Sequence, residues 1–274
     1  MPIQVDSKAM VSPKAKLSAG VQVGPYAVIG ENVKISSGCV IDSFAQVLGY
    51  TEIGKNNRIF SYAVVGNTPQ DLKYKGEESY LIIGDNNCVR EFVTINPGTE
   101  KGTKTVIGSD NLIMAYSHIA HDCIIGDGNI LANSSTLAGH VEIRNKVVIG
   151  GLTAIHQFCR IADYAIIGGC SKVVQDIPPY SMCDGHPASI CGLNLVGLRR
   201  AGFSAEVIKN LKNAFKILFF ENHPLDAAKQ LIKDKLLAFK ELNTLVEFVS
   251  SSKRGVAKSS KFECSTAANR QSSK

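Results

Sequence analysis

The sequence predicts an all-β solenoid followed by a small α-helical domain. Three observations lead to this fold class: an aliphatic residue recurs at every sixth position from Val5, the recurrence ends before Pro178-Pro179, and helical spacing begins near Ser204. The composition of the 274 residues, 45% hydrophobic and 20% charged, is that of a globular chain long enough to bury a sizeable core. Disordered and collagen-like chains have a different composition.

The repeat places Val, Ile or Leu at 26 positions in three uninterrupted blocks, Val5 to Val65, Ile83 to Ile95 and Ile107 to Val173. A second and usually small residue, such as Ala27 or Cys39, follows each of these four positions later. A period of six fits neither an α-helix nor an open amphipathic strand. It fits a triangular coil of 18 residues, whose three short strands each point one large and one small side chain inward, with coils stacked about 4.8 Å apart. We therefore expect a parallel β-helix over residues 1–190.

Two segments leave this pattern. The positions in phase with the repeat hold Asp71, Glu77 and Lys101, which are too polar for the inside of a coil. We expect solvated loops at residues 66–82 and 96–106.

The C-terminal part has helical spacing. Ser204 is a good N-cap for a helix that carries an apolar stripe from Val207 to Phe219, and Pro224 can open a second helix that runs to about Ser250. Residues 191–250 are thus expected to form a small helical domain with an apolar core.

The last segment, residues 251–274, holds six Lys or Arg against one acid, Glu263, and few apolar residues. We expect a disordered basic tail. Because it carries +5 of the net charge of +6, the other 250 residues are nearly neutral, and a nucleic-acid-binding surface is not expected.

The sequence also sets expectations about the compartment. It contains neither an 18-residue apolar run nor a basic and apolar leader at Met1, so we expect a cytoplasmic protein without a membrane span. The eight cysteines include no CxxC pair, which favours buried thiols over a zinc knuckle or a redox motif.

Four of the six histidines, His118, His121, His140 and His156, fall between residues 118 and 156, and none lies at an inward position of the repeat. His140 follows His121 by 19 residues, and His156 follows His140 by 16. Both separations are close to one coil, so these three are expected at one edge of the prism. Outward histidines on flat strands need cover, and we expect a homotrimer.

Two chemistries compete for this cluster. Histidines on neighbouring coils can bind zinc, as in a hexapeptide-repeat carbonic anhydrase. Alternatively, His121 acts without a metal as a general base for acyl transfer, with Asp122 orienting its ring. Gly139 follows His121 by 18 residues, so its N–H is expected beside the imidazole, where it can stabilise an oxyanion. A non-enzymatic scaffold that only binds partners is a third possibility.

Six segments of this chain, taken in order, resemble the UDP-N-acetylglucosamine O-acyltransferases of lipid A biosynthesis. The resemblance covers about residues 10 to 250 and rests on the segments 70–74 (QDLKY), 117–123 (SHIAHDC), 131–133 (LAN), 137–141 (LAGHV), 156–158 (HQF) and 197–200 (GLRR). It implies a left-handed β-helix with a C-terminal helical domain, assembled as a homotrimer with active sites between subunits. The donor would be a 3-hydroxyacyl group on acyl carrier protein, the acceptor the glucosamine 3-position of UDP-N-acetylglucosamine, and no cofactor or metal would be needed.

The resemblance also implies roles for single residues. His121 would be the general base, Asp122 its orienting partner and Gly139 the oxyanion donor, while Gly169 would limit the acyl length. Substrate would be bound by a further set of residues, namely Gln70, Asp71, Lys73, His118, His140, His156, Gln157, Asn194 and Arg200.

Three positions depart from the pattern of that family. Pro97 stands where the family often has Arg, Ala201 where a further basic residue is common, and His186 where Asn is usual. The first two departures put one donor contact and part of the phosphate contact in doubt. None of the three affects the expected base or the oxyanion donor.

Overall fold

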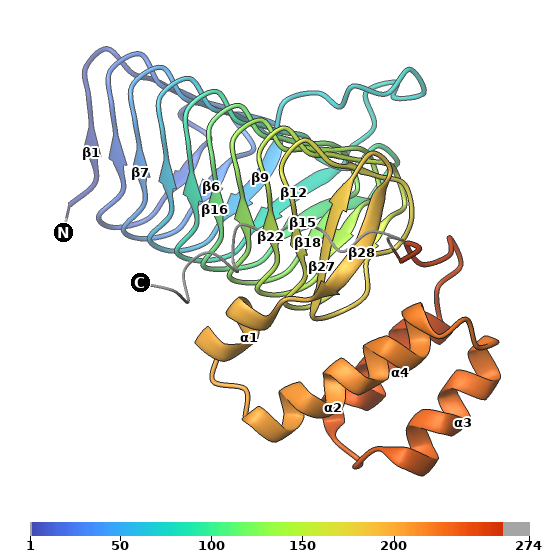
Figure 1. Cartoon of the computed structure of the whole chain (residues 1–274). Coiled ribbons are helices and arrows are strands. Elements are labelled where there is room, and N and C mark those ends of the chain that lie inside the picture. Colours follow the sequence, from blue (N-terminus) through green and yellow to red (C-terminus); the bar gives the residue numbers. More distant parts are fainter. Residues whose placement is uncertain (1, 260–274) are drawn as a thin grey trace.

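A computed structural model describes residues 2–259 of the chain. They form a triangular β-helix with helices at its C-terminal end (Figure 1). Strands pair in parallel with the strands one coil before and after, as in Ile41 with Ile59, and the coil is left-handed. The expected solenoid is therefore confirmed.

Three sheets make the sides of the prism. Each takes every third strand, except that sheet A ends with the hairpin β27–β28. Sheet A contains β1 Gln4–Val5, β4 Gln22–Val23, β7 Val40–Ile41, β10 Arg58–Ile59, β13 Cys88–Val89, β16 Leu112–Ile113, β19 Ile130–Leu131, β22 Val148–Ile149, β25 Ile166–Ile167, β27 Ser181–Gly185 and β28 Ala188–Leu193. Sheet B contains β2 Met10–Val11, β5 Val28–Ile29, β8 Gln46–Val47, β11 Val64–Val65, β14 Thr94–Ile95, β17 His118–Ile119, β20 Thr136–Leu137, β23 Ala154–Ile155 and β26 Lys172–Val173. Sheet C contains β3 Lys16–Leu17, β6 Lys34–Ile35, β9 Tyr50–Ile53, β12 Tyr80–Ile83, β15 Lys104–Ile107, β18 Ile124–Ile125, β21 Glu142–Ile143 and β24 Arg160–Ile161.

The core is the stack of aliphatic residues that the period of six identified. From Val23 to Val173 every one of these repeat residues is buried, and the small second residue, such as Cys39 or Ala63, is buried too. Val5 in the first coil is 45% exposed because no preceding coil covers it. Hydrophobic burial between coils thus accounts for the repeat.

The two loops are shorter than expected. β12 begins at Tyr80 and β15 at Lys104, so the segments outside the coils are residues 66–79 and 96–103. Tyr80 already pairs with Lys104 in the ladder of sheet C, and the next pair, Leu81 and Thr105, is fully buried. The polar residues that mark these loops lie before that point.

One corner of the prism carries an internal polar ladder. Asn57, Asn87, Asn111 and Asn129 are buried on successive coils, and each accepts a hydrogen bond from the amide of the next coil. The side-chain amides of the first three also donate to backbone carbonyls one coil away. Buried polar groups with partners of this kind fix the coil register, although the side-chain nitrogen of Asn129 is buried without a partner among the described residues.

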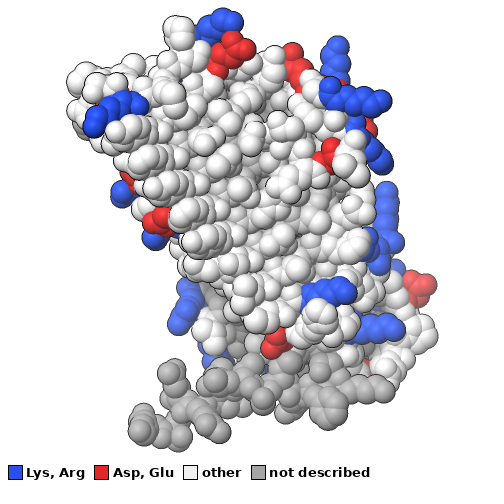
Figure 2. Space-filling view, turned by 90° about the horizontal axis from the view of Figure 1, so that it is seen from above, with Lys and Arg blue, Asp and Glu red and all other residues white. Residues whose placement is uncertain are grey.

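The outer faces differ in charge. Along sheet C the residue before the core residue is often charged, whereas along sheet B most are uncharged. Figure 2 shows a broad face on which Lys, Arg, Asp and Glu gather only at the margins. The charged residues among those of sheet C are Lys16, Lys34, Glu52, Glu142 and Arg160. All of those of sheet B are Met10, Val28, Gln46, Val64, Thr94, His118, Thr136, Ala154 and Lys172.

A stack of exposed aromatic rings, here called the aromatic ladder, follows the corner between sheets A and B. Neighbouring ring centroids lie 4.9 to 5.1 Å apart, and the rings are nearly parallel. Each side chain is 42 to 60% exposed. The ladder consists of Tyr26, Phe44, Tyr62, Phe92 and Tyr116.

The helical part begins after the β27–β28 hairpin. It contains α1 Leu195–Arg200, α2 Ala205–Phe215 with Ser204 as N-cap, the π-helix η1 Lys216–Phe220, α3 Leu225–Lys235 and α4 Lys240–Ser250. The single helix expected from Pro224 to Ser250 is wrong, because Leu236 is extended and its neighbour Leu237 donates an amide hydrogen bond to Asn210 of α2. The break folds α4 back, so that Leu242 and Leu245 are buried.

The first part of the expected disordered tail is ordered. After α4, residues 251–259 return to the β-helix, where Val256 bridges Asp176 and Ser259 bridges Ile190. Ala257 is buried there. Residues 260–274 of the predicted tail lie outside the described residues.

Two other expectations concern cysteines and membranes. Cys39, Cys123, Cys159 and Cys183 are buried as expected, but Cys170 is exposed because it lies in a corner of the coil. Cys264 lies outside the described residues. Among residues 2–259, no helix is both long and apolar enough to span a membrane.

Candidate active site

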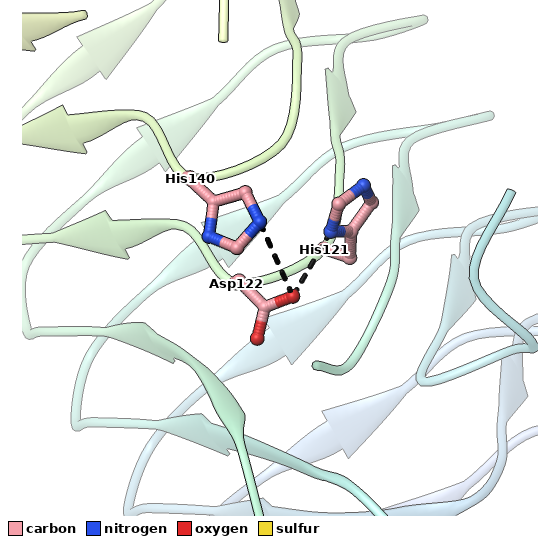
Figure 3. A group of neighbouring side chains, drawn as sticks. All are labelled: His121, Asp122 and His140. Carbon is pink, nitrogen blue, oxygen red and sulfur yellow. Dashed lines mark hydrogen bonds and ion pairs between the residues drawn. The ribbon is translucent and has the colours of Figure 1, made fainter. Parts of the chain in front are cut away.

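His121 and Asp122 lie in the corner between β17 and β18, where the chain turns from sheet B to sheet C (Figure 3). Asp122 has φ of 58°, a left-handed conformation that Asp tolerates better than most residues. The corner turns the two neighbouring side chains toward each other, and His121 Nδ1 lies 2.9 Å from Asp122 Oδ2. The expected pair is present.

The carboxylate of Asp122 is the centre of the cluster. Its Oδ2 accepts hydrogen bonds from the Thr99 amide (3.2 Å) and the Thr99 hydroxyl (2.7 Å), and only 8% of the side chain is exposed. Burial alone would raise the pKa of Asp122, but hydrogen bonds from His121, Thr99 and Thr103 and the nearby His140 outweigh it and lower the pKa. Asp122 is therefore held as a carboxylate that orients the imidazole.

Gly139 lies against the imidazole of His121. A Cβ at residue 139 would come 2.4 Å from His121 Cε1 and 2.6 Å from Nε2, so any larger residue would displace the ring. None of the hydrogen bonds found among residues 2–259 uses the Gly139 amide. The stacking expected from the 18-residue spacing is present, and among residues 2–259 the Gly139 amide has no hydrogen-bond partner.

His140 completes the cluster from the next coil. Its Nε2 lies 3.9 Å from Asp122 Oδ2, its ring meets that of His121 edge-on at 5.2 Å, and Phe158 stacks on its other face at 4.6 Å. The stacking of Phe158 on His140 was not predicted from the sequence. The signal was present, because Asp122, His140 and Phe158 are spaced by 18 residues.

His118 lies on β17 and is bound from the neighbouring strand. Its Nδ1 is 2.7 Å from the hydroxyl of Thr94. Burial lowers the pKa of His118, and the neighbouring His121 adds to the effect. His118 is thus a neutral hydrogen-bonding group in the wall of the site.

The loop of residues 66–79 reaches the cluster through Asp71. Its Oδ2 lies 3.8 Å from His121 Nε2, and its Oδ1 accepts the amide of Lys73 at 2.8 Å. The side chains of Gln70 and Lys73 are exposed, and Leu72 is fully exposed at the tip. Of the loop residues expected at the site, only Asp71 has a contact with His121 within this chain.

His156 and Gln157 lie one coil beyond His140, in the same corner and exposed. Arg254, from the segment after α4, places its Nη2 2.9 Å from His156 Nδ1. No sequence pattern predicted this contact, which joins residues 98 positions apart.

The remaining expected residues lie away from the histidines of the same chain. Gly169 is in the corner between sheets A and B, a different edge of the prism. Asn194 caps α1 by accepting the Gly197 amide and donates to Tyr164, and Arg200 ends that helix, exposed. One chain alone does not bring these three residues to His121.

The donor atoms of His121, Asp122 and His140 lie within 4.8 Å of one another, a spacing that a metal ion could use. However, Asp122 Oδ2 already accepts hydrogen bonds from Thr99 and His121. His121 and the Thr99 hydroxyl thus give this carboxylate hydrogen-bond partners without a metal.

Comparison with known proteins gives the same acyltransferase family that the six sequence segments resemble. The model for domain 2 of UDP-N-acetylglucosamine O-acyltransferase matches residues 176–257, and the bacterial transferase hexapeptide model, of six repeats, matches residues 104–139. The acyl-[acyl-carrier-protein]–UDP-N-acetylglucosamine O-acyltransferase of Thermodesulfovibrio yellowstonii is 49% identical over 93% of this chain and 99% of its own.

Solved structures agree with these matches. LpxA from Acinetobacter baumannii is 44% identical with a TM-score of 0.89, over 93% of this chain and 99% of its own. LpxA from Bacteroides fragilis, a UDP-N-acetylglucosamine acyltransferase, is 40% identical with a TM-score of 0.90, over 92% and 99%. With such identity over nearly the full length, the chain belongs to the family of acyl-[acyl-carrier-protein]–UDP-N-acetylglucosamine O-acyltransferases.

Proposed function

We propose that this enzyme transfers a 3-hydroxyacyl group from acyl carrier protein to the glucosamine 3-position of UDP-N-acetylglucosamine, the first step of lipid A biosynthesis. One observation carries the chemistry: His121 is bound through Nδ1 to a buried carboxylate, while its ring packs against Gly139, whose amide makes no hydrogen bond among residues 2–259. A base and an oxyanion donor are what acyl transfer from a thioester requires.

His121 acts as general base. Asp122 holds the proton on Nδ1, which leaves a lone pair on Nε2. Nε2 takes the proton of the acceptor hydroxyl as its oxygen attacks the thioester carbonyl. The carbonyl oxygen becomes an oxyanion, stabilised by the Gly139 N–H. The intermediate then expels the thiolate of the carrier, which takes the proton from His121.

The substrate residues fit an anionic sugar nucleotide. His118 and His140 lie next to His121, and Asp71 can accept a sugar hydroxyl. His156, Gln157, Asn194 and Arg200 offer donors for the nucleotide. Gln70 and Lys73 are exposed on the loop that carries Asp71 and offer further polar groups. Acyl transfer through these groups needs neither a covalent intermediate nor a cofactor.

The active assembly is a homotrimer. The aromatic ladder and the largely uncharged outer side of sheet B form a surface of the kind that subunit contacts cover. Such a contact also brings the corner of Gly169 in one subunit toward the histidine corner of the next. Gly169 of one subunit then lies in the acyl groove of the next subunit, where it limits the length of the acyl chain.

The experiment is an acyl-transfer assay with UDP-N-acetylglucosamine and acyl carrier protein loaded with 3-hydroxyacyl chains of several lengths. We expect one acylated sugar nucleotide, found by mass spectrometry, at a rate that a chelator leaves unchanged. Loss of activity with the chelator and recovery with zinc would favour the metal chemistry of His121, Asp122 and His140. No product from any donor would reject the proposed function.

A further inference from the structure

The segment that follows α4 fastens to the last coil of the β-helix. Ser252 donates its hydroxyl to the buried carboxylate of Asp176 at 2.8 Å, and Asp176 exchanges backbone hydrogen bonds with Gly255 and Ala257. Asp176 is also paired with Arg160 at 3.0 Å. We call residues 252–259 the C-terminal strap. Because these anchors are buried, the strap holds its side chains in fixed positions.

Arg254 is the strap residue that faces the substrate corner. Its Nε donates to the carbonyl of Val174 at 2.8 Å, and its Nη2 lies 2.9 Å from His156 Nδ1. It also lies close to the thiol of Cys159, whose pKa burial raises to about 11. The guanidinium is thus held by neutral groups, and no carboxylate neutralises it among the contacts of the described residues.

This contact determines which nitrogen of His156 carries the proton. A guanidinium can only donate, so a hydrogen bond from Arg254 requires a lone pair on His156 Nδ1. The same Nδ1 lies 3.2 Å from the Gln157 carbonyl, which it could reach only as an N–H donor. The two contacts are mutually exclusive, and the positively charged donor at 2.9 Å favours the form with hydrogen on Nε2.

We propose that Arg254 is a positioning residue that holds His156 as an Nε2–H donor, and that the two form a binding site for a phosphate group of the nucleotide. A guanidinium has five N–H groups, of which Val174 and His156 take two, so others remain for an anion. Charge-assisted donors of this type suit a diphosphate. The choice of phosphate rests on the proposed function, whereas the state of His156 does not.

The test compares Arg254→Met, which removes every donor, with Lys253→Met, which removes one charge from an exposed neighbour on the same strap. The probes are the ¹⁵N shifts of the His156 ring and calorimetric titration with UDP alone. In the native enzyme and in K253M we expect hydrogen on Nε2. In R254M we expect Nδ1 to gain hydrogen and donate to Gln157, and UDP to bind on the order of 10-fold more weakly.

Steady-state kinetics add a further readout. R254M should raise KM for the sugar nucleotide while kcat changes little, because the base is untouched. Arg254→Lys should bind UDP with intermediate affinity, since a lysine keeps the charge but not the planar fork with which the guanidinium contacts Val174 and His156. It also serves as the test if R254M does not fold.

The outcomes separate the two claims. UDP that fails to bind the native enzyme would reject the proposed function, while the shifts of His156 would still test the contact. UDP that binds native enzyme and R254M equally, or ring shifts that are the same in both, would overturn the inference.

Discussion

The chemistry of the site depends on a few atoms around Asp122. His121 and Thr99 share one carboxylate oxygen of Asp122, so the proposed base is oriented before substrate arrives. Sequence spacing predicted His121, Asp122 and Gly139, because residues 18 apart stack in a coil. It could not predict Thr99 or Arg254, which approach from segments outside the repeat and therefore have no fixed spacing to the histidines.

The tight contact between Gly139 and the imidazole gives a prediction for this residue. In Gly139→Ala the added Cβ would come within 2.6 Å of His121 Nε2, so the ring must turn away from Asp122. We expect kcat to fall on the order of 100-fold with the fold intact. Gly30→Ala is the control, since its Cβ meets nothing closer than 3.4 Å. A normal kcat for G139A would show that the ring is not confined.

His118 makes stability depend on pH. Its pKa in the folded chain is lowered by burial from the ordinary 6.5, so between the two values the unfolded chain binds more protons. The free energy of unfolding should therefore fall as pH drops below about 6.5 toward the lower folded pKa. Urea unfolding at several pH values checks this, with His118→Gln expected to be less sensitive to acid. Identical pH dependence in H118Q and the native chain would contradict it.

At the scale of elements, the repeat was predictable almost residue by residue. Inward aliphatic residues are dictated by burial alone, which leaves a period of six in the sequence. The predicted loops are a few residues too long. In the second loop the reason is that Thr105 continues a strand although it is polar. The helix from Pro224 was wrongly continued through Leu236, since apolar spacing does not record that Asn210 binds the chain there. Tertiary contacts decided those boundaries.

The aromatic ladder predicts how the subunits assemble. Phe92→Glu places a charge between two stacked rings, where a trimer contact would have to desolvate it. Light scattering should then give a mass near that of one 29.4 kDa chain, against about three times that for the native protein. Tyr50→Glu, on sheet C, is the control and should remain trimeric. A trimeric F92E would place the contact elsewhere.

Gly169 should limit the length of the acyl chain. A Cβ there would lie 3.2 Å from the Gly151 carbonyl, so a side chain fits after a small shift and protrudes outward. Each buried methylene contributes about 0.8 kcal/mol, and Gly169→Met should therefore prefer donors shorter by about two to four carbons. Gly169→Ala should shift the preference less. The donor series of the transfer assay measures both, and an unchanged profile in a folded trimer would place the limit elsewhere.

The whole molecule combines a rigid β-helix with helices and a strap that return to its last coil. Composition suggested that everything after Ser250 is disordered, yet buried backbone bonds to Asp176 hold residues 251–259. Such bonds were invisible in the sequence because the segment is polar and its partner lies about 80 residues earlier. Gly169 and His121 stand on different edges of one chain, so the proposed acyl groove requires a second subunit.

The central claim is that His121 removes the proton of the acceptor. The most direct measurement compares turnover and UDP affinity of His121→Ala with those of the native enzyme, using His223→Ala, in the helical part, as the matched control. We predict that H121A loses turnover on the order of 100-fold or more, with UDP affinity within about twofold and H223A unaffected. Turnover that survives in H121A, falls only in step with UDP binding, or returns on addition of zinc would contradict the account.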